Sequence, residues 1–207
     1  MLSRIPADAW LVIISSVLPL GAGIFYWNIS SRPLRILTAL LFYNFTNNIA
    51  LLLLALWGVN NMFLLHVYAP IAYTLLATLF SYWQQKRPAL YMRISIPLFI
   101  IIYLILLTTG YENLRLPNKN TLSIMSLFTA IITLSTLFYA SRTQPTLHIY
   151  NDERLWVSVG TFSNYALNVT IFSSIPTYIT RQLWLIYSIL AIIGNLLYLR
   201  AYLCLRK

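Results

Sequence analysis

The polar groups that could hold another molecule in this chain are mostly side-chain amides set inside apolar runs. Asn44, Asn47 and Asn48 fall at positions i, i+3 and i+4, a spacing that places three amides on one face of a helix. Other polar residues inside such runs are His66, Tyr73, Asn164, Tyr165, Asn168 and Asn195. Amides and phenols hold a ligand by hydrogen bonds, but they lack an adjacent base that would activate a nucleophile. All of these residues are therefore candidates for ligand binding.

The four acidic residues lie where the apolar runs end. They are Asp8, Glu112, Asp152 and Glu153. A proton pump, a cation-coupled transporter or a carboxylate-dependent intramembrane enzyme would be expected to keep an ionisable group at membrane depth, because charge is retained there for use. The sequence therefore argues against these three classes.

Motifs of known catalytic chemistry are absent from the sequence. It contains no His-Glu-x-x-His pair, no Gly-x-Ser-x-Gly elbow and no glycine-rich phosphate loop. The serines have no base at membrane depth that could activate them. We therefore expect a protein that is not an enzyme and uses no cofactor.

The two histidines each allow a second interpretation. His66, near one end of the third apolar run, could sense external acidity, although a lone histidine is more often a hydrogen-bonded side chain. His148, Asp152 and Glu153 have a spacing that would suit a weak metal site on a helix. Zinc sites normally use better ligands and more of them, so we expect a solvated loop and no metal there.

Composition indicates an integral membrane protein. Hydrophobic residues make up 59% of the chain and charged residues 9%, against roughly 45 to 50% and about 25% in soluble domains. The net charge of +10 could suggest a nucleic-acid partner, but the basic residues stand singly or in small groups between apolar runs. We interpret them as orientation signals and expect no nucleic acid. The single cysteine, Cys204, excludes an internal disulfide.

Seven apolar runs approach the length of about 20 residues that crosses about 30 Å of hydrocarbon. They are Asp8–Trp27, Leu34–Trp57, Met62–Trp83, Ile94–Tyr111, Thr121–Ala140, Leu155–Ile175 and Leu183–Leu203. The connections between them are short and carry helix breakers such as Pro33, Gly58 and Pro88. We predict an all-α polytopic membrane protein, a single domain over 1–207 built as one bundle of seven transmembrane helices.

The basic residues predict the orientation of this bundle. Ten Lys and Arg lie in the first, third and fifth loops and at the C-terminal end, against four at the N-terminus and in the other loops. Cytoplasmic loops carry the excess of positive charge. We therefore expect the N-terminus outside and the C-terminus in the cytoplasm, in a bacterial inner membrane or a plasma membrane.

The polar faces of the second, third, sixth and seventh predicted helices should meet in a seam inside the bundle. An amide that faced lipid would leave hydrogen-bonding groups unsatisfied. One interpretation is structural, since interhelical hydrogen bonds contribute about 0.6 to 2 kcal/mol each. The other is a cavity, open to the outer face, that binds a small neutral or amphipathic ligand. The sequence leaves both interpretations open.

Two families of seven-helix proteins can be compared with this pattern. The retinal proteins need a lysine in the last helix and an acid in the third, and neither Leu183–Leu203 nor Met62–Trp83 carries one. Two segments carry a different resemblance: His66-Val67-Tyr68, and Leu155–Gly160 leading into Asn164-Tyr165. On these residues the chain resembles the small bacterial seven-transmembrane, sensor-like proteins that stand alone or precede a signalling domain.

This resemblance implies a receptor-like signalling role in which the bundle binds a ligand and relays the event. The chain carries no appended kinase or output domain, so the signal would pass to a separate cytoplasmic or membrane protein. Two alternatives remain from the residues alone. One is a facilitative carrier or channel for a small neutral solute, which needs no coupling carboxylate, and the other is a scaffold subunit of a membrane complex. Solute flux into proteoliposomes distinguishes the carrier, and a co-purifying partner distinguishes the scaffold.

Overall fold

The computed structural model of the chain is all-helical. It describes residues 7–143, 150–173 and 180–206, and the side chains of 10–143, 150–165 and 185–205. The helices are α1 Ala7–Phe25, α2 Arg32–Leu56, α3 Met62–Ser81, α4 Lys86–Thr108, α5 Lys119–Thr143, α6 Glu153–Ser173 and α7 Thr180–Leu203, followed by a short 3-10 turn η3 at Cys204–Arg206. The prediction of an all-α chain with seven long helices is confirmed.

Five of these helices are long and apolar enough to cross a membrane. They are α2, α3, α4, α5 and the Leu185–Leu203 part of α7, and α1 carries a shorter apolar stretch at Trp10–Phe25. These spans support a multi-pass membrane protein. Helix α6 is not among the five, and its described face carries Ser158 and Thr161, both fully buried.

The start of α4 differs from the prediction. The basic stretch from Lys86 to Arg93 was predicted to be a loop before a helix at Ile94, but it forms the first two turns of α4. Pro88 lies in the first turn, where backbone N–H groups have no intrahelical acceptor, so the missing N–H of proline costs little there. Gln85 precedes the helix in an extended conformation and ends the α3–α4 connection.

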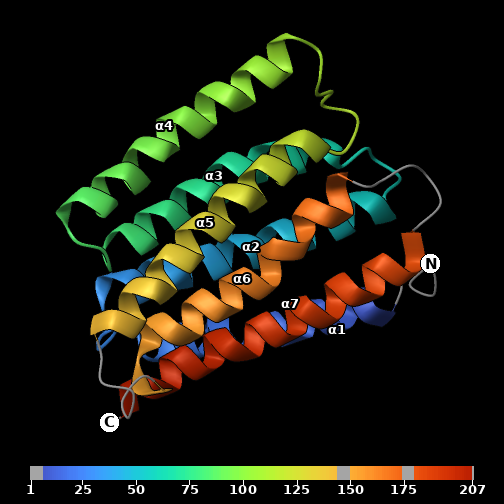
Figure 1. Ribbon diagram of the computed structural model, residues 1–207. Coiled ribbons are helices and arrows are strands. Elements are labelled where there is room, and N and C mark those ends of the chain that lie inside the picture. The colour runs from blue at the N-terminus through green and yellow to red at the C-terminus, as the bar shows by residue number, and fades with distance from the viewer. Residues whose placement is uncertain (1–6, 144–149, 174–179, 207) are drawn as a thin grey trace.

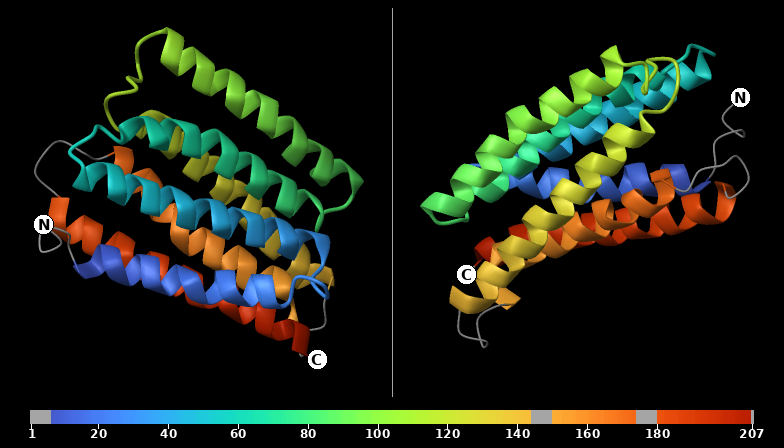
Figure 2. Two further views of the ribbon diagram at one scale, coloured as in Figure 1. Left: turned by 180° about the vertical axis from the view of Figure 1, so that it is seen from behind. Right: turned by 45° about the horizontal axis from the view of Figure 1, so that its top comes forward.

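Six helices form a closed ring. Along it, α1 contacts α2, α2 contacts α3, α3 contacts α5, α5 contacts α6, α6 contacts α7, and α7 returns to α1. Helix α4 lies outside the ring against α3, as Figure 1 shows. Figure 2 shows α2, α3 and α4 side by side on one side of the molecule. The two chain ends lie at opposite ends of the bundle (Figure 1), and we call these the N-terminal and C-terminal ends.

Helix α5 shows how the residues sort between the inside and the outside. Thr129 and Thr133 are fully buried, while Leu127, Ile131 and Leu134 on other faces are about half exposed. The Thr133 hydroxyl donates to the Thr129 carbonyl 2.9 Å away, so its polar group is satisfied within the helix. A surface of exposed leucine and isoleucine around buried hydroxyls suits a hydrocarbon surrounding and not water.

A glycine allows α1, α2 and α7 to approach closely. A Cβ placed on Gly23 of α1 would lie 2.5 Å from Thr38 Oγ1 and 2.9 Å from the Tyr202 hydroxyl. Thr38 cannot easily move away, because its hydroxyl is bonded to both Tyr202 and the Leu34 carbonyl. Small residues serve the same purpose at other membrane helix contacts, where they bring backbones together.

We predict that Gly23→Ala destabilises the fold by about 1 to 3 kcal/mol, because the added methyl overpacks the contact with Thr38 and Tyr202. Gly21→Ala is the matched control on the same helix, since no atom lies within 4 Å of its Cβ position. The control should be neutral or stabilise by up to about 1 kcal/mol through helix propensity. Equilibrium unfolding in detergent measures both, and equal effects of the two substitutions would contradict this packing.

Candidate functional site

A hydrogen bond between two tyrosines joins α3 to α6. The Tyr68 and Tyr165 hydroxyls lie 3.0 Å apart. On the other side of Tyr68, the Tyr43 ring of α2 stacks nearly parallel to it, with ring centroids 5.8 Å apart. Stacking of this kind contributes about 0.5 to 1.5 kcal/mol beyond burial of the rings. Tyr68 therefore connects α2 and α6 through the middle of the ring.

Two tyrosines one turn apart on α7 extend this arrangement. The Tyr198 hydroxyl lies 3.1 Å from Thr161 Oγ1 of α6 and also forms a hydrogen bond with the Asn164 side chain. The Tyr202 hydroxyl lies 2.7 Å from Thr38 Oγ1 of α2 and 3.1 Å from the Leu34 carbonyl. Both α7 tyrosines are almost fully buried. We call Tyr43, Tyr68, Tyr165, Tyr198 and Tyr202 the tyrosine network.

The structure thus brings together α2, α3, α6 and α7, the four helices that the sequence predicted to share a polar seam. The contacts that join them are made mainly by tyrosine and threonine hydroxyls. The three asparagines of α2 contribute none of the hydrogen bonds between the described side chains of these four helices. Two of the candidate residues predicted from sequence, Tyr165 and Asn164, take part in these contacts.

His66 and Tyr73 lie on a different face of α3 and do not join the tyrosine network, contrary to the seam predicted from sequence. The two residues are seven positions apart, so they share one helix face. His66 Nε2 lies 3.1 Å from the Asn113 carbonyl and 3.0 Å from the Leu116 carbonyl. Both partners are acceptors, so Nε2 carries the proton. His66 therefore fixes the α4–α5 connection to the N-terminal end of α3.

Tyr73 has a similar structural position further along this face. Its hydroxyl lies 2.6 Å from Ser95 Oγ of α4, and its ring packs on Phe99 with centroids 4.5 Å apart. Tyr68 and Tyr73 differ by five positions, or 140° around a helix with 3.6 residues per turn, and so point to different neighbours. Tyr73 is thus the point at which α4 attaches to the ring.

The asparagines of the candidate site divide into two groups. Asn195 Nδ2 donates to Ser15 Oγ of α1 over 2.9 Å, and Asn164 lies directly over Gly194, where a Cβ would come within 2.5 Å of its side chain. These two make helix contacts. In α2, the buried Asn44 Oδ1 has no hydrogen-bond partner among the described residues. Asn47 and Asn48 are partly exposed, and the Asn168 side chain lies outside the described residues.

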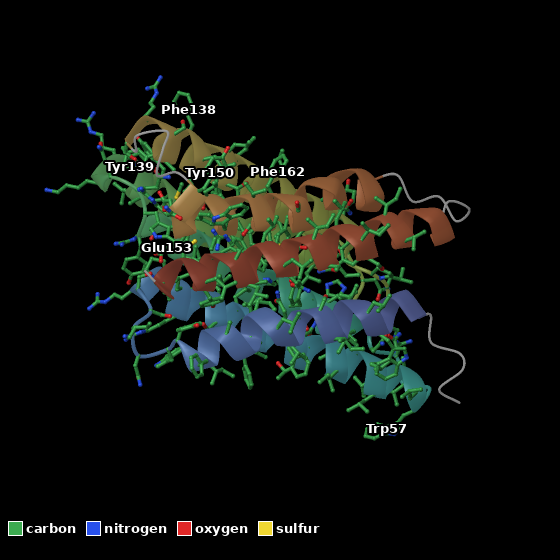
Figure 3. All side chains as sticks on the ribbon, turned by 90° about the horizontal axis from the view of Figure 1, so that it is seen from below. Trp57, Phe138, Tyr139, Tyr150, Glu153 and Phe162 are labelled. Atoms are coloured by element: carbon green, nitrogen blue, oxygen red, sulfur yellow. The ribbon has the colours of Figure 1, made fainter. Side chains whose placement is uncertain are left out.

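A cavity of about 610 Å³ opens at the C-terminal end of the bundle, where α3, α5, α6 and α7 meet. Its walls include Trp83, Tyr139, Glu153, Arg154 and Cys204. Figure 3 shows Glu153 and Tyr139 at this end of the bundle, far from Trp57 at the other. The sequence analysis considered Asp152 and Glu153 only as part of a metal site with His148, and His148 lies outside the described residues.

Asp152 and Glu153 stand in different surroundings although they are adjacent. Asp152 caps α6, since its Oδ1 accepts the Arg154 backbone N–H over 2.9 Å. Its Oδ2 lies 2.7 Å from Arg154 Nη2 in a salt bridge. Glu153 Oε1 instead accepts a hydrogen bond from Ser31 Oγ over 2.7 Å, and the Trp83 side chain forms another with it. Within the described part of the chain, no three His, Cys, Asp or Glu side chains gather as metal ligands.

These surroundings shift two pKa values. Burial is the main cause that raises the pKa of the Glu153 carboxyl above its ordinary value, and the Asp152 charge adds to this rise. The hydrogen bond from Ser31 opposes it in part. The pKa of Arg154 is raised chiefly by its hydrogen bond to Asp152. Arg154 is therefore paired with Asp152, and the charged form of Glu153 is destabilised by its partial burial.

No family model, curated protein or solved structure matches this chain. Its functional interpretation therefore depends on its own residues. Spacing predicts part of the network: Thr161 and Tyr165 on α6, like Tyr198 and Tyr202 on α7, stand four positions apart and share a face. Nothing in the sequence signals that Thr38 would meet Tyr202.

We predict that Glu153→Gln stabilises the protein near pH 7.5 and that the gain shrinks as the pH falls toward 4.5. Glutamine keeps an acceptor for Ser31 and Trp83 but carries no charge. Because the folded-state pKa of Glu153 is raised, its contribution to stability is full below the unfolded pKa and is lost as the pH rises through the folded pKa. Thermal unfolding at both pH values measures this.

Asp152→Asn is the control for this measurement, because its expected change in stability at pH 7.5 has the opposite sign. It should destabilise the protein at pH 7.5, because Arg154 would lose its salt-bridge partner. The prediction would be contradicted if Glu153→Gln were less stable than the parent at pH 7.5. It would also be contradicted if the substitution changed the unfolding temperature by the same amount at both pH values, because the buried charge would then not be the cause.

Proposed function

We propose that this chain is a non-catalytic sensor that crosses an inner or plasma membrane seven times, with the N-terminus outside and the C-terminus in the cytoplasm. It binds a small neutral or amphipathic ligand within the bundle and relays this event to a separate protein partner. The resemblance to small bacterial sensor-like seven-helix proteins supports this role. In this proposal α1 and α6 also span.

The helix arrangement supports the proposed orientation. The N-terminus and the C-terminus lie at opposite ends of the bundle (Figure 1), as an odd number of spans requires. The C-terminal end holds the first turn of α4 with Lys86 and Arg87, together with Arg200 near the end of α7. This is the end that the positive-inside rule assigns to the cytoplasm.

The observation that carries the relay is the run of buried contacts along the bundle. Tyr165 of α6 bonds Tyr68 of α3. One turn before Tyr165 on α6, Thr161 bonds Tyr198 of α7. One turn beyond Tyr198, Tyr202 bonds Thr38 of α2. Ser31, immediately before α2, bonds Glu153 in the wall of the cavity. A shift of α6 near Tyr165 is therefore communicated by direct contact to the C-terminal end.

The binding end of this proposal is the face of α2 that carries Asn44. From Tyr43 to Leu56 this helix holds no buried residue, in contrast to its first ten positions. Asn44 Oδ1 is nevertheless buried and has no hydrogen-bond partner among the described residues, so it suits a ligand N–H or O–H. The neighbouring Tyr43 stacks on Tyr68 and thereby joins this face to the tyrosine network.

Reagents that cannot cross a membrane test the orientation. Cys204 should react with N-ethylmaleimide in intact cells but not with a sulfonated, impermeant maleimide, because its end of the bundle faces the cytoplasm. The control is Leu114→Cys in a Cys204→Ser background. Leu114 lies 53% exposed in the α4–α5 connection, and the cysteine placed there should react with the impermeant reagent. Reaction of both sites from the same side would contradict the proposed topology.

Removing one hydroxyl tests the relay. Tyr165→Phe deletes the bond to Tyr68, and an interhelical bond of about 0.6 to 1.7 kcal/mol corresponds to a population shift of about 3- to 17-fold. We expect the rate of maleimide modification of Cys204 in nanodiscs to change within that range.

Tyr73→Phe is the matched control for Tyr165→Phe, because it deletes a tyrosine hydroxyl bond of the same kind outside the network, to Ser95. Cys204 should be modified at the parent rate in this variant. An unchanged rate in Tyr165→Phe, or an equal change in both variants, would refute the relay.

A further inference from the structure

The cavity at the C-terminal end, where the proposed relay ends on the Ser31–Glu153 bond, has a wall chemistry that the relay does not explain. Its lining includes two carboxylates, Asp152 and Glu153, and one guanidinium, Arg154. The formal charge of this lining is therefore −1, in a chain whose net charge is +10. The cavity is a local exception to the basic character of this end of the bundle.

Glu153 is the group in this wall that can meet an added cation. Arg154 is turned to Asp152, which it contacts through both Nε and Nη2. Glu153 forms no salt bridge within the described residues, and its hydrogen-bond partners Ser31 and Trp83 are neutral. A carboxylate offers about four acceptor positions, so these two bonds leave capacity for an ammonium group.

Aromatic rings in the cavity wall can also contact a cationic ligand. Tyr82, Trp83 and Tyr139 line the cavity together with Glu153. The Arg93 guanidinium lies 5.9 Å from the centroid of the Tyr82 ring, so this ring already contacts a cation. Trp83 and Tyr139 remain to contact the organic body of a ligand, and a cation over such a ring gains about 0.5 to 2 kcal/mol.

We propose that this cavity binds a small organic ammonium compound. The ammonium group donates to Glu153, and an aromatic or apolar body packs against Trp83 and Tyr139. The site is separate from the ligand face on α2, so it does not depend on the proposed sensor function.

Cys204 is a built-in reporter for this site, because it is the one cysteine of the chain and lines the cavity. The test measures the rate of its modification by N-ethylmaleimide in nanodiscs of neutral phosphatidylcholine. The probes are benzylammonium, benzyl alcohol and benzoate, which share a ring and differ in charge. We expect benzylammonium at saturation to slow the modification about fivefold or more, and the alcohol and the acid to leave it unchanged.

Substitutions assign this protection to the cavity. Glu153→Gln should raise the half-protecting concentration of benzylammonium about tenfold, the worth of one charge-assisted hydrogen bond. Tyr139→Leu should raise it about threefold, and it keeps the test valid if Glu153→Gln folds poorly. Glu112→Gln is the matched control, because that carboxylate accepts the Thr121 backbone N–H at the opposite end of the bundle, and it should leave protection unchanged.

Three results would overturn the proposal. They are the absence of protection by benzylammonium, equal protection by benzyl alcohol, and an unchanged half-protecting concentration in both Glu153→Gln and Tyr139→Leu. The sensor proposal fails by a different result, an unaltered rate in Tyr165→Phe without any added probe. The two outcomes are therefore distinguishable in the same assay.

Discussion

The hydrogen bond between Tyr68 and Tyr165 is the interaction on which the rest of this molecule depends. Hydrocarbon offers a hydroxyl or an amide no partner, so each polar group in a spanning helix must find one inside the protein. The two tyrosines satisfy each other across the ring, and α2 and α7 assemble around the same requirement through Thr38 and Tyr202. The exposed leucines and isoleucines of α5 are the outer side of this arrangement.

The same requirement gives α3 two roles. One face, with Tyr68, turns into the ring and meets α2 and α6. The other, with His66 and Tyr73, holds α4 and the α4–α5 connection in place. His66 and Tyr73 of α3 thus hold α4 and its following connection, whereas Tyr68 connects helices inside the ring. The interpretation of interior amides as structural glue fits Asn195 and Asn164, whereas Asn44 Oδ1 has no hydrogen-bond partner among the described residues.

Much of the architecture could be predicted from sequence, because run length and helix breakers depend only on local composition. The ends of α2, α3 and α7 fall within a few residues of the predicted runs. The start of α4 could not be placed, since a proline in a first turn reads as a loop signal. Helical spacing showed that His66 and Tyr73 share a face but not which neighbour that face meets. The cavity around Glu153 arises where four helix ends converge, and no local pattern records that convergence.

A double-mutant cycle on Tyr68 and Tyr165 tests the central claim most directly. Tyr68→Phe, Tyr165→Phe and the double variant are unfolded reversibly in mixed micelles, and the coupling free energy is taken from the three changes in stability. If the two hydroxyls satisfy each other inside the membrane, the coupling should be about 0.6 to 1.7 kcal/mol. A coupling of zero, with the two single changes simply adding, would contradict the claim that this bond joins α3 to α6.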